Sequence, residues 1–380
     1  MVNIAVMGYG TVGSGVVEVI NTNGDIINQR AADQINIKYV LDLRDFPGDP
    51  IQEKIVHDVD VIINDPEIRI VVEVMGGVEP AYTFVKSCLE AGKSVVTSNK
   101  ALVAKHGAEL LSIARDRELN FLFEASVGGG IPIIRALNSS LTADKIEEIT
   151  GILNGTTNYM LSKMFYEGAD YADVLKEAQQ NGFAEADACR KIAILSCLIS
   201  GQQVDFEDIY TEGITEITKE DMMYAKEMDM TVKLLASSKR HGDHLHAIVA
   251  PALLGKEHPL YNVNGVFNAV FVTGNMLGDA MFYGSGAGKH LHRNIMTMWK
   301  NEKLTLLPIE DTCKRFFVRL QGGENERRAE IENIFGGVQF LTVDGLENEF
   351  GIVTPEMTER EYRQKSEQLS GVIRMIRLEE

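Results

Sequence analysis

The sequence predicts an α/β protein in three parts, and three observations support this. The first third alternates short apolar strands with helical patterns, which is typical of a doubly wound parallel sheet. After Ile131-Pro132, apolar helices occur together with strands of alternating pattern, as in an α+β domain. From about Thr305, the order strand, helix, two strands, helix, strand indicates a split βαβ domain of typical small-domain size. The expected ranges are 1–130, 131–284 and 305–380.

The elements of the first part follow from hydrophobic periodicity and from glycine and proline punctuation. The expected strands are Asn3–Met7, Ile35–Leu41, Arg69–Met75, Ser94–Thr97 and Phe121–Glu124, and the expected helices are Thr11–Ile20 and Pro80–Ala91.

The same reading gives the rest of the chain. In the middle part we expect strands at Ile146–Leu153, His246–Ala250 and Val266–Thr273, and helices at Tyr159–Glu167, Tyr171–Gln180 and Ala188–Ile199. In the last part we expect strands at Arg315–Leu320, Val338–Val343, Phe350–Val353 and Ile373–Leu378, and helices at Glu326–Ile334 and Thr358–Ser370.

Composition narrows the class of protein. Among 380 residues, 45% are hydrophobic and 24% charged, as in an ordinary globular protein. A net charge of −18 argues against a general nucleic-acid binder, which needs a basic surface. We expect no membrane span, because no apolar run approaches the ~18–20 residues required. The four cysteines show no paired spacing, so we expect reduced thiols in a cytoplasmic protein.

A glycine-rich turn follows the first strand. Gly8, Gly10 and Gly13 match GxGxxG between a strand and a helix. Gly8 permits the tight turn, Gly10 lets a pyrophosphate approach the backbone, and Gly13 lets the helix pack closely on its strand. The amides of Thr11 and Val12 open the helix, whose positive dipole end favours phosphate. The turn predicts a Rossmann-type dinucleotide site.

The choice of nicotinamide cofactor depends on the end of the second strand. Asp42 follows Tyr39-Val40-Leu41 and is a candidate for binding the adenine ribose. Arg44 lies two residues later and could bind a 2′-phosphate instead. The two readings predict NAD and NADP respectively, and the sequence leaves both open.

Further ordered segments carry a resemblance to a known family. They are Val95-Val96-Thr97-Ser98-Asn99-Lys100, the run from Phe123 to Pro132, the run from Gly151 to Tyr159, and Gly182-Phe183-Ala184-Glu185-Ala186-Asp187. Together with the glycine turn they resemble homoserine dehydrogenase over residues 1 to about 300. The C-terminal βαββαβ stretch is similar to the ACT regulatory domain of many bacterial members.

The resemblance implies reversible, NAD- or NADP-dependent reduction of L-aspartate 4-semialdehyde to L-homoserine, in threonine, methionine and isoleucine biosynthesis. It makes Lys191 the proton donor. The residues themselves agree, because Asp187 and Lys191 are four apart and share one helix face before an apolar stretch. A partly desolvated lysine has a lowered pKa and becomes a useful acid. The alternative is an exposed ion pair on a helix surface.

The resemblance assigns several further positions. Glu185 is expected at the substrate's amino end and near the cofactor, and Gly182 as a backbone contact. Asp187 is either the residue that begins the family's acidic loop or the one that orients the substrate, and its spacing to Lys191 favours the second. Lys100 follows a strand end, where Rossmann folds place ligands, although a solvated loop lysine is the alternative. The expected cofactor-binding residues are Gly8, Gly10, Thr11, Val12, Gly13, Lys100, Gly182, Glu185 and Gly286, the last of them on a return segment of about 285–302.

The loop from Glu124 to Ile131 resembles the family's monovalent cation site. Its expected sodium ligands are backbone carbonyls of Glu124, Val127, Gly129 and Ile131, since hard cations prefer oxygen. A plain glycine-rich hinge is the alternative.

Three segments depart from the family pattern. An acidic loop of the family is missing after Asp187, and a Pro-Thr-Ala-led helix is missing after Lys289. We hypothesise that two stretches are absent from this sequence, which a Cα separation above ~3.8 Å at 187–188 or 289–290 would reveal. The C-terminal domain has Gly322-Gly323-Glu324-Asn325 in place of an acidic-Pro-Gly effector turn, which leaves feedback control open.

One alternative is the chemistry of aspartate-semialdehyde or glyceraldehyde-phosphate dehydrogenase, which needs a nucleophilic cysteine. Another is a non-catalytic redox sensor that binds NAD(P). The histidines His241, His244 and His246 could suggest zinc, but a polar hairpin turn explains them better.

Because the family pairs sheets in its second domain, we expect a homodimer or a higher homo-oligomer.

Overall fold

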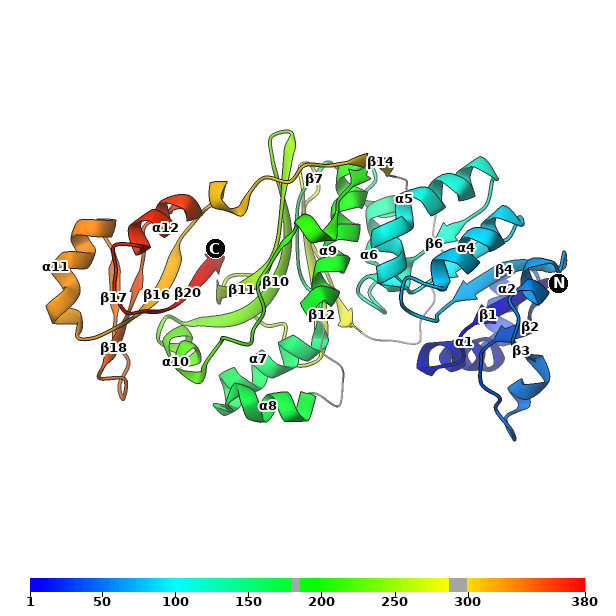
Figure 1. Cartoon of the computed structure of the whole chain (residues 1–380), viewed down its shortest axis with the longest axis horizontal. Coiled ribbons are helices and arrows are strands. Elements are labelled where there is room, and N and C mark those ends of the chain that lie inside the picture. Colours follow the sequence, from blue (N-terminus) through cyan, green and yellow to red (C-terminus); the bar gives the residue numbers. More distant parts are fainter. Residues whose placement is uncertain (179–184, 287–298, 380) are drawn as a thin grey trace.

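The computed structural model describes residues 1–178, 185–286 and 299–379. The molecule is elongated, with its three parts in a row (Figure 1). The first sheet lies at one end, a sheet with long strands lies in the middle, and the C-terminal helices α11 (Glu324–Phe335) and α12 (Glu359–Ser366) lie at the other end.

The first sheet is parallel throughout, with strand order β3-β2-β1-β4-β5-β6. This is the strand order of a Rossmann fold. Its strands are β1 (Val2–Met7), β2 (Ile35–Leu41), β3 (Ile55–Val56), β4 (Ile68–Glu73), β5 (Ser94–Thr97) and β6 (Phe121–Leu122), and its main helices are α1 (Thr11–Thr22), α2 (Gly24–Ala31), α4 (Ala81–Glu90) and α5 (Lys100–Asp116). The predicted fold of this part is confirmed. Strands β2 and β5 have the predicted bounds, while α2, α5 and β3 were not predicted.

The middle part is built on antiparallel strands in the order β13-β12-β7-β10-β11. These are β7 (Ile146–Ile152), β10 (Met230–His241), β11 (His244–Gly255), β12 (Phe267–Gly274) and β13 (Gly278–Ser285). Strands β10 and β11 form a hairpin in which His241 pairs with His244. His241 and His244 therefore flank the hairpin turn, as predicted, whereas His246 lies within β11 and is buried.

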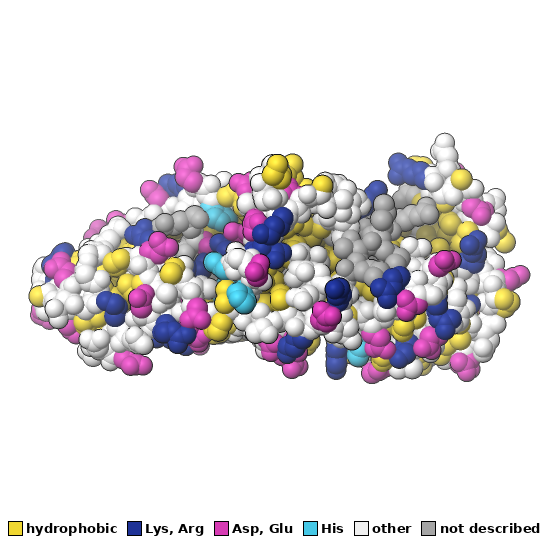
Figure 2. Space-filling model, turned by 90° about the horizontal axis from the view of Figure 1, so that it is seen from above, with side chains coloured by type: hydrophobic (Ala, Val, Ile, Leu, Met, Phe, Trp, Pro, Cys, Tyr) yellow, Lys and Arg dark blue, Asp and Glu magenta, His cyan; other side chains and the backbone are white. Residues whose placement is uncertain are grey.

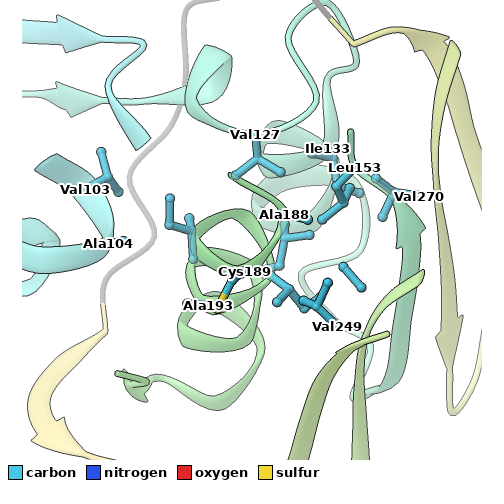
Figure 3. Packing of buried hydrophobic residues seen from close by; sticks show 14 of the residues in the cluster. Val103, Ala104, Val127, Ile133, Leu153, Ala188, Cys189, Ala193, Val249 and Val270 are labelled. Atoms are coloured by element: carbon cyan, nitrogen blue, oxygen red, sulfur yellow. The ribbon is translucent and has the colours of Figure 1, made fainter. Parts of the chain in front are cut away.

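Helices cover one face of the middle sheet. They are α7 (Gly155–Glu167), α8 (Tyr171–Ala178), α9 (Glu185–Ser200) and α10 (Lys219–Glu227). The buried residues of α9 pack on both sides, and Figure 3 shows this helix between Val103 of α5 and Val249 of β11. Helix α9 therefore links the nucleotide-binding part to the middle sheet through one continuous hydrophobic core.

The C-terminal part has the predicted βαββαβ order. Its strands are β16 (Phe316–Gln321), β17 (Gln339–Leu341), β18 (Glu349–Val353) and β20 (Val372–Glu379), in sheet order β20-β16-β18-β17. Instead of a separate sheet, this module continues the middle sheet, because β20 pairs in parallel with β11 at Ala252–Leu254. The result is a ten-stranded sheet.

Buried ion pairs fasten the module to the middle part. Arg377 of β20 donates to Glu359 of α12, within the module, at 3.0 Å. It also donates to Glu212 of the middle part, which follows β9 (Tyr210–Thr211), at 2.7 Å. Arg319 of β16 donates to Asp221 of α10 at 2.7 Å. Strand pairing and ion pairs together fix the module against the sheet.

After the undescribed range 287–298, the chain returns at the boundary between the first two parts. The ring of Trp299 lies so close to Gly107 of α5 that a Cβ there would be 2.5 Å from it. Its Nε1 donates to Gln203 of β8 (Gln202–Gln203) at 2.9 Å. Strand β14 (Lys300–Lys303) then pairs with β8.

Among the described residues, no helix is long and apolar enough to cross a membrane. On the face shown in Figure 2, acidic and basic side chains are interspersed. Helix α9 passes through Asp187 and Ala188 without a break, so the first hypothesised junction shows no gap. The second, at 289–290, lies outside the described residues.

Candidate active site

The glycine turn has the geometry that a pyrophosphate cradle requires. Gly8 has φ +101°, a conformation that favours glycine, and its N–H donates to Leu41 at 2.8 Å. A Cβ at Gly13 would lie 1.9 Å from the Gly8 carbonyl, whereas a Cβ at Gly10 would meet nothing within 4 Å. The space above Gly10 and the first-turn amides of α1 therefore fit a dinucleotide phosphate.

Asp42 is bound to the turn itself. Its Oδ2 accepts from the N–H of Tyr9 at 2.8 Å, and its two oxygens accept from the Arg44 guanidinium at 3.0 and 3.1 Å. The hydrogen bond and charge of Arg44 hold the pKa of Asp42 well below its usual range, although burial opposes this. Only 10% of the Asp42 side chain is exposed, against 62% of Arg44. Arginine is therefore the group at this position that faces solvent.

Lys191 and Asp187 form a buried centre at the start of α9. The Nζ of Lys191 lies 2.6 Å from Oδ2 of Asp187 and donates to the carbonyl of Leu153 at 2.8 Å. Lys100 approaches the other oxygen, Oδ1, at 2.8 Å. The structure thus brings together three residues that the sequence placed in one cleft.

Burial sets the ionisation of this centre. It lowers the pKa of Lys191 below its ordinary value, and the charge of Asp187 opposes this shift without cancelling it. Burial alone would raise the pKa of Asp187, but the charges of Lys191 and Lys100 outweigh it and lower that pKa. The lysine is thus poised to exchange a proton nearer neutral pH than an exposed lysine.

Asn154 belongs to this centre and was missed as a functional residue. Its Oδ1 accepts from the N–H of Thr157, so it caps α7, and its Nδ2 donates to Asp187 at 3.3 Å. An asparagine directly before a helical run is a capping signal that sequence reasoning could have used.

Sequence reasoning also missed Glu73, whose hydrogen bonds fix the start of the helix that carries Lys100. Glu73, at the end of β4, is fully buried and accepts from Thr97 Oγ1 at 2.5 Å and from the N–H of Met75 at 2.8 Å. Thr97 Oγ1 in turn accepts from the N–H of Asn99, the residue that caps α5. Since Lys100 is the first residue of α5, this network fixes where its side chain begins.

The structure describes some of the other predicted site residues and not others. Gly182 lies outside the described residues, and nothing is described of the side chain of Glu185, which begins α9. Gly286 follows β13 and packs against Asn268 of β12.

The Glu124 carboxylate is buried and accepts from the N–H groups of Ile134 and Arg135, at 2.9 and 2.8 Å. Glycines with positive φ at 128 and 129 shape the loop that follows.

The thiols lack the features of a catalytic nucleophile. Cys88, Cys189 and Cys197 are buried, and burial raises the pKa of each. Cys313 is exposed on the C-terminal side, far along the chain from the Lys191 centre. A nucleophilic thiol needs a lowered pKa and access, so the three buried cysteines do not fit thiol catalysis.

Known proteins match almost the whole chain. The family described as homoserine dehydrogenase, NAD binding domain, matches residues 8–124, and the homoserine dehydrogenase family matches residues 132–291. A homoserine dehydrogenase of Synechocystis is 37% identical over 421 aligned residues, covering 97% of this chain and 96% of that one. This alignment is longer than the 380 residues here, so it contains gaps in this chain.

Solved structures agree with these matches. The crystal structure of a homoserine dehydrogenase from Thiobacillus denitrificans covers 100% of this chain and 98% of its own, with TM-score 0.89 and 33% identity. A hyperthermophilic archaeal homoserine dehydrogenase in complex with NADPH covers 76% of this chain and 92% of its own, with TM-score 0.64 and 28% identity. The chain therefore belongs to the homoserine dehydrogenase family of oxidoreductases.

Proposed function

We propose that the chain reversibly reduces L-aspartate 4-semialdehyde to L-homoserine, with Lys191 as the general acid. The observation that carries this proposal is the buried centre formed by Lys191 and Asp187. A substrate aldehyde bound beside it would receive its proton from Lys191. The nicotinamide cofactor, when bound, supplies or accepts the hydride. The redox-sensor alternative gives no role to a lysine held at lowered pKa.

Each member of the centre has its own task. Lys191 holds a proton at Nζ, directed by the Leu153 carbonyl and by Asp187, and gives it to the oxygen of the aldehyde. In the reverse direction, neutral Lys191 takes the proton of the hydroxyl group. Asp187 orients the ammonium group and balances its charge, and Lys100 keeps Asp187 ionised. Glu185, through its carboxylate, is proposed to bind the substrate's ammonium end.

We propose NADP as the preferred cofactor. The support is the position of Arg44, whose exposed guanidinium lies at the end of β2, where the adenine ribose binds in Rossmann folds. Asp42, the alternative ribose ligand, already accepts from Tyr9 and Arg44. The archaeal relative that binds NADPH is consistent with this preference.

We further propose a sodium ion on the carbonyls of Glu124, Val127, Gly129 and Ile131. The support is a loop with two positive-φ glycines, anchored by the buried Glu124 carboxylate at the N–H groups of Ile134 and Arg135. Such a loop can turn several carbonyl oxygens inward, as hard cations require. Activity in sodium should exceed activity in choline at equal ionic strength.

A homodimer joined through β13 is the proposed assembly. This strand ends the ten-stranded sheet and carries exposed Met281 and Tyr283, and Tyr283 stacks on Phe267 at 5.1 Å. Unprotected apolar strand edges tend to pair with another chain.

The proposed function is tested by following absorbance during homoserine oxidation at alkaline pH, with NADP and NAD compared. We expect turnover with homoserine, faster with NADP. Lys191→Ala should lower kcat by about 10²–10⁴ while cofactor affinity stays the same. Lys303→Ala, which removes an exposed lysine paired with Asp208, is the matched control and should leave kcat unchanged. Unchanged turnover in Lys191→Ala, or turnover abolished by cysteine alkylation, would overturn the mechanism.

A further inference from the structure

Asn268 is a buried asparagine of the middle sheet whose amide finds no hydrogen-bond partner among the described residues. It lies on β12, 1% exposed, and pairs with Gly284 of β13. Among the residues that the structure describes, neither its Oδ1 nor its Nδ2 has a hydrogen-bond partner, and no other side chain there has two such atoms. Native proteins satisfy nearly all buried polar groups, so an orphaned amide requires a reason.

The amide lies between Gly155 and Gly286, the second of which is a predicted cofactor contact. A Cβ at Gly155, the first residue of α7, would be 3.3 Å from Asn268 Oδ1 and 2.6 Å from the Val266 carbonyl. A Cβ at Gly286 would be 2.3 Å from Asn268 Nδ2. At Gly286 the amide itself leaves no room for a side chain. At Gly155 the nearest obstacle is the Val266 carbonyl, and the amide is in tight contact beside it.

Each glycine belongs to a different half of the site. Gly155 follows Asn154, whose amide donates to Asp187 next to Lys191. Helix geometry leaves the first N–H groups of α7 without intrahelical acceptors. Gly286 follows β13 beside the sodium loop, because the N–H of Gly130 donates to the Ser285 carbonyl at 3.4 Å. The amide therefore lies where the proton-donating centre meets the segment assigned to the cofactor.

A second buried asparagine shows what a purely structural amide does here. Asn158 of α7 is also 1% exposed, but its Nδ2 donates to the carbonyls of Val263, Gly265 and Phe267 at 3.1 Å. These hydrogen bonds hold the loop before β12 in place. Asn268 makes no comparable hydrogen bond, so stability does not explain why an amide stands there.

We propose that Asn268 is a positioning residue for the reaction. Its amide sets the spacing between the α7 N-terminus and Gly286, and forms hydrogen bonds with these two backbones when substrate and cofactor are bound, with Oδ1 accepting and Nδ2 donating. It thereby aligns the Lys191 centre with the cofactor without touching either. This inference rests on the proposed function, since it refines the geometry of the same site.

The test is the variant Asn268→Leu, which keeps the size of the side chain and removes its polar atoms. We expect an unchanged or higher Tm, because an unsatisfied buried amide is lost. We also expect kcat for homoserine oxidation to fall at least tenfold, with the pH dependence that reports Lys191 unchanged. Asn158→Leu is the matched control for stability and should lower Tm, because it loses its hydrogen bonds. Asn268→Ala gives a second measurement of kcat if the leucine variant does not fold.

The outcomes distinguish a failure of this inference from a failure of the proposed function. If the unaltered chain does not oxidise homoserine, the proposed function fails. If that chain is active and Asn268→Leu keeps its kcat within twofold, the positioning role alone is wrong. A Tm of Asn268→Leu as low as that of Asn158→Leu would equally overturn it, because the amide would then be a structural group.

Discussion

The Nζ of Lys100 lies 2.8 Å from Oδ1 of Asp187, and this ion pair joins the first residue of α5 to the start of α9. Helix α5 packs on the nucleotide-binding sheet, while α9 packs on the middle sheet. The pair therefore crosses the boundary between the two parts at the proposed reaction centre. A shift of one part against the other would change the electrostatic environment of Lys191.

Replacing Asp187 with Asn should move the pH dependence of both reaction directions. The carboxylate raises the pKa of Lys191 against the effect of burial, so without it that pKa falls further. Reduction needs protonated Lys191, so its alkaline limb should move to lower pH. Oxidation needs neutral Lys191, so its acidic limb should move the same way. We expect roughly 10- to 100-fold slower reduction at neutral pH, measured as kcat against pH.

The control for this change is Asp205→Asn, which alters a carboxylate paired with the exposed Lys303. Its pH profile should match that of the unaltered chain. Profiles of Asp187→Asn that coincide with the unaltered ones would show that Asp187 does not set the ionisation of Lys191.

Replacing Arg44 with Ala should weaken NADP selectively. The guanidinium is mostly exposed beside the glycine turn, and its loss leaves Asp42 as the charged group there. We expect KM for NADP to rise about tenfold or more, with KM for NAD unchanged or lower, since a charged hydrogen bond contributes roughly 1.5–3 kcal/mol. Arg115→Ala, an exposed arginine of α5, should leave both constants unchanged. Equal effects on the two cofactors would contradict the proposed role.

Lys233 should make the stability of the fold depend on alkaline pH. Burial lowers its pKa to about 8, and its Nζ donates to Val263 and Asn264 rather than to a carboxylate. Between about pH 8 and the ordinary lysine pKa of 10.5, the folded state binds fewer protons than the unfolded state, so stability rises with pH. Lys233→Met should remove this rise, up to roughly 3 kcal/mol, in urea unfolding at several pH values.

Lys256→Met is the comparison for Lys233, because Lys256 is exposed and paired with Asp229. It should keep the rise in stability that Lys233→Met removes. The same slope in both variants would mean that Lys233 titrates normally in the folded protein.

Placing charge on the edge of β13 should separate the proposed dimer. Met281 and Tyr283 are 44% and 51% exposed on this terminal strand. Met281→Lys combined with Tyr283→Lys should give a monomer in light scattering after size exclusion. Met276→Lys, in the turn before the strand and 84% exposed, should remain a dimer. A dimer in all three chains would place the interface elsewhere.

Local patterns predicted the elements whose signals lie within a short stretch of sequence. The runs Ile35–Leu41 and Ser94–Thr97 are strands with the predicted bounds, because both are short and rich in β-branched or aromatic residues. Strand β10 was missed, since its second half, Ser-Ser-Lys-Arg-His, is polar. Several of these polar side chains are nevertheless buried, with Ser238 held by Ser196 at 2.8 Å.

The candidate site was predictable where motif and spacing coincide, as at Gly8 or at Asp187 and Lys191. It was not predictable where contacts span the chain. The surroundings of Asn268 include Gly155, more than a hundred residues before it, and Gly286, nearly twenty residues after it. No local pattern contains that information. Long-range packing, rather than residue type, creates such positions.

The parallel pairing of β20 with β11 has a consequence for synthesis. Strand β11 leaves the ribosome long before β20, so at Ala252–Leu254 the edge of β11 that faces away from β10 has no partner strand during that interval. Contacts of such high sequence separation form slowly, and an open strand edge is a site at which chains associate. Translation that stops before residue 372 would leave this edge permanently open, and the truncated product would be prone to aggregate.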